Sequence, residues 1–135
     1  MPSSDPRLEA RRDRVLTNYS GYIHLKRSPV SGNGMALHVS FTPTDSRPGF
    51  ERSVPLRVTG GIEASEVEFR IEIVSTTLRF RPARLTATVV PGDAPREWSF
   101  TCSRVPPGKH RLFVQVSQKD RLLQVAPLNF EGSST

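Results

Sequence analysis

The sequence predicts an all-β protein in which two antiparallel sheets pack as a β-sandwich. Three observations support this fold class. Many short apolar segments alternate with a period of two, proline- and glycine-containing turns separate them, and nothing after the first twenty residues has helical spacing. A chain of 135 residues can bury a core of its own. We therefore expect one sandwich domain of eight or nine strands over residues 19–131.

The clearest stretch is the predicted hairpin at residues 105–130. It opens with the turn Pro106–Gly108, because proline fixes φ and glycine accepts a positive φ. Residues 109–117 then alternate between apolar and polar, as in a half-buried strand. A polar break at 118–120 leads to a second apolar strand at 121–130. A lone hairpin is only marginally stable, so this one should close the edge of a larger sheet.

The remaining strands are expected where alternation returns between polar loops. They are residues 19–27, 35–41, 54–58, 66–73, 85–89 and 98–102, with a further short strand at Leu78 and Phe80. The loops are expected at 28–34, 42–53 and 91–95. Pro82 cannot donate to a sheet ladder and indicates an edge, bend or bulge. Cys102 alternates with Trp98 and Phe100, so we expect all three to face the core.

Both ends of the chain differ from the rest in composition. Residues 1–18 are predicted to form a basic arm or short helix, with Asp5 as its N-cap and Pro6 at the first helical position. Residues 132–135 are predicted to be a disordered tail. No apolar run could serve as a signal peptide or a membrane helix, and the single cysteine forms no internal bridge. We therefore expect a cytoplasmic protein.

Catalytic and metal-binding patterns are missing from the sequence. The three histidines, His24, His38 and His110, are scattered without ligand spacing, and we expect structural or solvent roles for them. No nucleophile signature or paired carboxylates appear, and the glycine loops lack the following helix and lysine that phosphate binding uses. We expect a non-enzymatic protein with no catalytic residue, no metal and no cofactor.

The segment from Val105 to Val116 resembles the corner that leads into the penultimate strand of immunoglobulin-like and fibronectin-type-III-like domains. The resemblance places His110 where these families often have a corner tyrosine. The chain departs from the families in two respects, because it has no cysteine pair and Trp98 lies one strand too late. The ending is also similar to sandwich modules fused to bacterial signalling and defence effectors, which implies a place in a multi-component system of that kind.

The net charge of +6 must be weighed against its distribution along the chain. Many arginines alternate with apolar or acidic neighbours, which is typical of the solvated face of a sheet. We therefore expect a protein-interaction or scaffolding module with an unidentified, acidic protein partner. The candidate contact residues are basic or exposed aromatic: Arg7, Arg11, Arg12, Arg14, Phe50, Arg111, Phe113 and Arg121.

The alternative is a basic sandwich that binds nucleic acid or a glycan. A single-strand platform needs several aromatic rings on one basic face. Phe113 could contribute to one only if its strand and the strands of Arg111, Arg121, Arg79 and Arg81 are neighbours.

Overall fold

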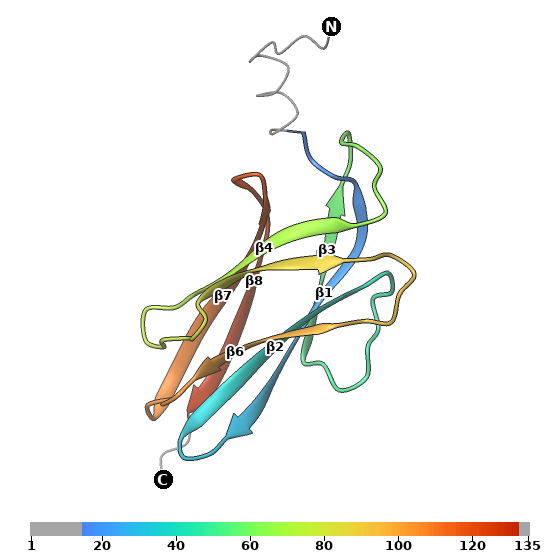
Figure 1. The fold of residues 1–135 in the computed structure, drawn as a ribbon. Coiled ribbons are helices and arrows are strands. Elements are labelled where there is room, and N and C mark those ends of the chain that lie inside the picture. The colour runs from blue at the N-terminus through green and yellow to red at the C-terminus, as the bar shows by residue number, and fades with distance from the viewer. Residues whose placement is uncertain (1–14, 133–135) are drawn as a thin grey trace, which may run out of the picture.

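The computed structural model describes residues 15–132, which form two four-stranded antiparallel sheets packed face to face (Figure 1). The first sheet has the order β3-β1-β2-β6, and the second has the order β5-β4-β7-β8. The strands are β1 (Tyr19–Val30), β2 (Gly34–Thr42), β3 (Arg52–Val58), β4 (Val67–Val74), β5 (Arg84–Val89), β6 (Glu97–Cys102), β7 (Gly108–Gln118) and β8 (Arg121–Gly132). The predicted β-sandwich is confirmed.

The core lies between the two sheets because each strand turns its apolar positions inward. In β4, Val67, Phe69, Ile71 and Ile73 are buried, whereas their polar neighbours lie on the outer face. Figure 1 shows the two layers crossing at an angle, as the twist of sheets leads one to expect. Cys102 and Phe100 are fully buried, and Trp98 packs against the same core, as their alternation predicted.

The predicted hairpin forms as β7 and β8. Gly108 has a φ of 112°, so the turn before β7 uses the freedom of glycine. Lys119 and Asp120 both have positive φ, 48° and 63°, and make a two-residue turn. Such a turn matches the right-handed twist of the strands that it joins. The hairpin lies at the edge of the second sheet, where β8 pairs with β7.

The strand predicted at Leu78 and Phe80 is wrong. Both side chains are buried, 5% and 7% exposed, but their backbone lies outside the eight strands. Only Arg81 pairs with a strand, through two backbone hydrogen bonds to Thr101 of β6 at 2.8 and 3.1 Å. Pro82 then interrupts the pairing because it has no N–H. The segment therefore crosses from the second sheet to the edge of the first.

Two predicted loops are shorter than their composition suggested. β1 continues to Val30, which pairs with Gly34, so only residues 31–33 form the turn. Between β2 and β3, the loop is residues 43–51. Cross-strand hydrogen bonds extend strands into proline- and serine-containing segments that a local pattern assigns to loops.

The chain enters the sandwich beside the β7–β8 turn (Figure 1). The Thr17 backbone N–H donates to Gln118 Oε1 at 2.9 Å, and Gln118 Nε2 donates back to the Thr17 carbonyl at 3.2 Å. Residues 15–132 contain no helix, and hence none that could cross a membrane. The helix or arm predicted before residue 15 lies outside the described residues, as does the predicted tail after Gly132.

His110 fixes the corner between β6 and β7. Its Nε2 lies 2.6 Å from the Pro106 carbonyl oxygen, and its Nδ1 lies 2.8 Å from the Thr77 hydroxyl. A carbonyl can only accept, so Nε2 carries the proton and Nδ1 accepts from Thr77. His110 is 6% exposed, so its ring nitrogens would be costly to bury without these two hydrogen bonds. This imidazole therefore joins β7 to the turn four residues upstream and to the β4–β5 connection.

The hydrogen bond from His110 to the Pro106 carbonyl can be tested with two aromatic replacements of similar size. We expect His110→Tyr to be more stable than His110→Phe by about 1 kcal/mol, because the phenol can still donate to the Pro106 carbonyl. Chemical denaturation of both variants measures this difference. Equal stabilities, or a more stable phenylalanine variant, would show that the bond to Pro106 contributes nothing.

Candidate functional site

The inner faces of the sheets form the core, so binding has to use the outer faces, the edges or the ends of the sandwich. We call the outer face of the first sheet the first face. Cross-strand register brings its polar side chains into rows: Ser53, His24, Ser40 and Glu97 form one row, and Lys26, His38 and Ser99 form the next. The local sequence does not predict these rows, because the strands that form them are far apart along the chain.

His24 is fully buried although its position points away from the core. Its Nε2 lies 2.5 Å from the Thr42 hydroxyl, and its Nδ1 lies 2.6 Å from the Ser53 hydroxyl. Thr42 donates its own proton to the Thr44 carbonyl at 2.9 Å, so Nε2–H donates to Thr42 and Nδ1 accepts from Ser53. Burial lowers the pKa of His24, because the charged imidazolium would lose its hydration.

The β2–β3 loop, residues 43–51, covers His24 with the ring of Phe50. The two rings meet edge to face, with centroids 5.8 Å apart. Lys26 Nζ lies 4.7 Å from the Phe50 centroid, and Arg47 Cζ lies 4.6 Å from it. Arg47 also donates to the Ser40 hydroxyl. Phe50, which the sequence suggested as a partner contact, is thus engaged within the molecule.

Glu97 lies beside the cations Lys26 and Arg47 and beside His38 on the first face. Its carboxylate lies 3.1 Å from Lys26 Nζ, 3.5 Å from Arg47 Nη2 and 4.0 Å from His38 Nδ1. Arg27, in phase with the inward residues of β1, forms a separate ion pair with Glu51 at 2.6 Å, and hydrogen bonds from that guanidinium hold the pKa of Glu51 below its ordinary value. The first face therefore satisfies most of its polar groups internally.

The outer face of the second sheet, the second face, differs because it carries an apolar strip. Val74 lies opposite Phe113, and Phe113 lies opposite Pro127, so three strands contribute to one row. Val125 and Leu122 extend the strip along β8. Val74 is 37% exposed and Leu122 is 56% exposed. Contiguous exposed apolar side chains of this kind mark interaction sites in soluble proteins.

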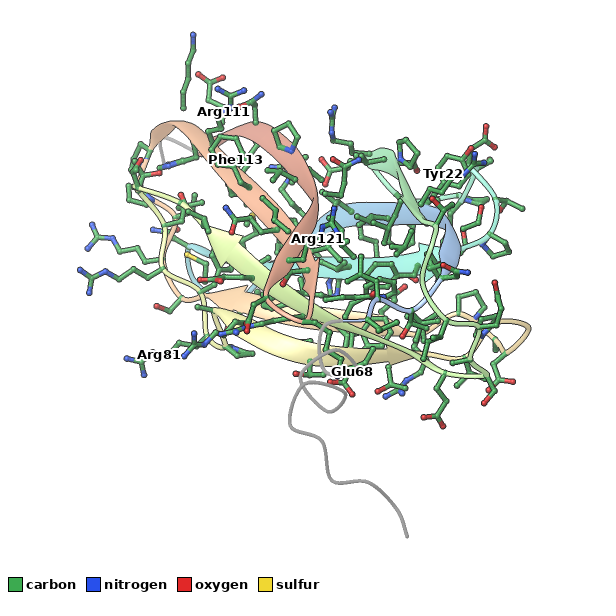
Figure 2. The ribbon with its side chains drawn as sticks, turned by 90° about the horizontal axis from the view of Figure 1, so that it is seen from above. Tyr22, Glu68, Arg81, Arg111, Phe113 and Arg121 are labelled. Atoms are coloured by element: carbon green, nitrogen blue, oxygen red, sulfur yellow. The ribbon has the colours of Figure 1, made fainter. Side chains whose placement is uncertain are left out.

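Charged side chains surround the apolar strip. Arg111 Cζ lies 5.1 Å from the centroid of Phe113, and Figure 2 shows these two side chains together. Arg84 of β5 lies opposite Glu72 of β4, and Arg70 lies between Glu68 and Glu72 along β4. Within the part of the chain that the structure describes, none of these five charged groups forms an ion pair. The second face thus presents apolar groups and arginines that are free to contact a partner.

The sheet edges are less open than the second face. Pro55 in β3 and Pro127 in β8 each remove a backbone donor from an edge strand. Gln124 Nε2 donates to the Pro55 carbonyl at 2.8 Å and joins these two edges. On the other side, Arg81 occupies part of the β6 edge. Strand addition by a partner is therefore hindered at three of the four edges.

The candidate residues from the sequence do not form a single site. Arg111 and Phe113 are neighbours on the second face, whereas Phe50 lies on the first face. Arg121 begins β8, opposite Gln118 and well away from Phe113 (Figure 2). The four N-terminal candidates, Arg7, Arg11, Arg12 and Arg14, lie outside the described residues.

The structure adds apolar residues that the sequence had not singled out: Val74, Leu122, Val125 and Pro127. The outward positions of Val74, Val125 and Pro127 follow from alternation, whereas Leu122 faces outward because the β7–β8 register shifts between Val116 and Ser117. Their grouping depends on which strands pair, and nothing local encodes that. Alternation alone therefore predicts most of these residues to face outward, but it does not predict that they form one strip.

Residues 15–132 contain no group of three His, Cys, Asp or Glu side chains that could hold a metal ion. Comparison of the chain with protein-family models finds no match, and neither does comparison with curated proteins.

Burial of neutral His24 predicts a loss of stability in acid. Its pKa in the folded protein lies below the value of about 6.5 in an unfolded chain. Its contribution is therefore complete above about pH 6.5 and is lost as the pH falls through the folded pKa. The unfolding free energy measured across this range should decrease as the pH is lowered. His24→Gln should make this dependence on pH less steep. An unchanged slope in the variant would contradict a buried neutral imidazole.

Proposed function

We propose that this protein is a non-catalytic, immunoglobulin-like interaction module that binds an acidic protein partner through its second face. The observation that carries the proposal is the contrast between the two faces. The first face is covered by its own loop, and its Glu97 forms ion pairs with Lys26 and Arg47. The second face exposes an apolar strip beside arginines, as at interfaces where an apolar centre has a charged rim.

Strand order supports the immunoglobulin-like assignment. The order β8-β7-β4-β5 corresponds to the G-F-C-C′ sheet of such sandwiches, and β1-β2-β6 corresponds to A-B-E. β3 is an addition beside β1. The His110 bond to the Pro106 carbonyl also has the place of the tyrosine-corner bond, which runs from the start of strand F back to the upstream backbone.

Charge favours an acidic partner. The chain has a net charge of +6, and Arg111 stands directly over the central ring of the strip. Complementary charge at the rim of an interface raises the association rate and suppresses wrong partners. The predicted contribution of the arginines at positions 7–14 stays part of this proposal. By analogy with effector-fused modules, the partner would belong to a multi-component signalling or defence system.

Nucleic acid is the less favoured ligand. The second face carries one aromatic ring among its described residues, Phe113, whereas stacking platforms use several. Arg81, which such a platform would have needed, pairs with β6 of the other sheet and lies far from Phe113 in Figure 2. The arrangement therefore offers no basic aromatic platform for bases.

The proposal is tested by affinity capture from host lysate with the tagged full chain. Phe113→Ala should weaken recovery of a defined protein about tenfold, since aromatic anchors at interfaces commonly contribute more than 1 kcal/mol. Phe50→Ala is the matched control, because Phe50 is also half-buried and also lies against a cation. It should leave recovery unchanged.

Charge is tested in the same assay by Arg111→Glu, with Arg57→Glu as the control on an exposed part of β3. Only the first substitution should reduce capture. Nuclease treatment and a salt series accompany each sample. Loss of capture after nuclease, or equal effects of the Phe113 and Phe50 variants, would overturn the proposed face and partner class.

A further inference from the structure

A cleft of about 540 Å³ opens between the two sheets at the end of the sandwich where β2, β3 and β5 end. Its apolar lining comes from both sheets and from the β5–β6 connection: Tyr19, Phe41, Val58, Val89, Val90 and Pro95. The volume lies within the range of about 300–1,000 Å³ that is usual for small-molecule sites. None of the five residues of the second-face strip lines this cleft, so it is a separate feature.

Tyr19 and Phe41 are the aromatic residues that line the cleft, and both pack on the buried ring of Phe69 behind it. Phe41 from the first sheet stacks on Phe69 from the second, with centroids 5.1 Å apart and an interplanar angle of 14°. Tyr19 meets both rings edge to face, at 6.3 Å from Phe41 and 5.1 Å from Phe69. Such rings offer faces and edges to a further planar group, an arrangement that aromatic pairs prefer.

The Tyr19 hydroxyl provides a polar group in this apolar setting. It makes no hydrogen bond to another residue that the structure describes, and it lies close to the backbone of Gly21. A Cβ at position 21 would fall 2.7 Å from this hydroxyl and 2.6 Å from the Thr42 carbonyl, so glycine is needed there. Burial raises the pKa of Tyr19 to about 12. The phenol therefore stays protonated near neutral pH and can donate to a ligand.

The mouth of the cleft has mixed charge. Arg57 supplies a cation, and Glu63 and Asp93 supply carboxylates. Asn18 Nδ2 donates to Glu63 at 2.7 Å, which orients this carboxylate but leaves its charge in place. The two carboxylates outnumber the single cation, so the mouth disfavours an anionic ligand. An uncharged ligand fits the apolar lining, because a cation would lose its hydration inside the cleft.

We infer that this cleft binds an uncharged, planar small molecule that carries a hydrogen-bond acceptor, such as a ring carbonyl. The ring contacts the Tyr19 and Phe41 wall, and the acceptor takes the Tyr19 hydroxyl proton. Partner binding by the second face is independent of this site, since the cleft opens at an end of the sandwich.

Coumarin is a suitable probe, because it is planar, uncharged and has a ring carbonyl. Titration of the full chain with coumarin, followed by backbone amide NMR, should give saturable shifts that are largest at residues lining the cleft. Tyr19→Phe keeps the ring and removes the donor, so its dissociation constant should rise roughly fivefold. Tyr22→Phe, at the other tyrosine, is the matched control and should bind as the natural chain does.

A second variant tests the space in the cleft separately from the Tyr19 hydroxyl. Val90 lines the cleft and is 37% exposed, so Val90→Trp can fill the space without disturbing the core. This variant should abolish saturable binding while keeping the native amide spectrum elsewhere. Shifts that do not saturate, shifts centred outside the cleft, or equal affinities of the Tyr19→Phe and natural chains would overturn the inference. Phe113→Ala should leave coumarin binding intact, which keeps this test apart from that of the partner.

Discussion

The alternation of apolar and polar side chains is the constraint on which the rest of the structure depends. Each sheet can bury only one of its faces, so the two inner faces form one core and two outer faces remain. The two outer faces differ in composition. One is built from hydrogen-bonding and charged groups that pair with one another, and the other keeps apolar side chains in contact with solvent.

The first face shows how a polar surface can be closed without a partner. Neutral His24 bridges Thr42 and Ser53, and the Phe50 ring covers it. Because every buried polar side-chain atom among the described residues has a hydrogen-bond partner, opening this region would expose bonds that are already satisfied. A partner gains more at the second face, where association removes apolar surface from water without first breaking such a network.

Sequence patterns predict the fold well and the site only in part. Alternation predicts β4 and β7 with the correct inward faces, and it predicts that Phe113 points outward. It cannot show that Val74 and Pro127 flank Phe113, since those contacts depend on pairing between distant strands. It also mispredicts Leu78 and Phe80, whose burial resembles that of a strand. The cover over His24 comes from a loop, and no periodicity encodes where a loop folds.

The central claim is that a partner contacts the second face and not the first. Site-specific photo-cross-linking tests it most directly, with benzoylphenylalanine placed at Val74 on the second face or at Thr101, an exposed position on the first sheet. The account predicts that position 74 gives a discrete protein adduct in host cells and that position 101 does not. The same adduct from position 101 with none from position 74 would contradict it.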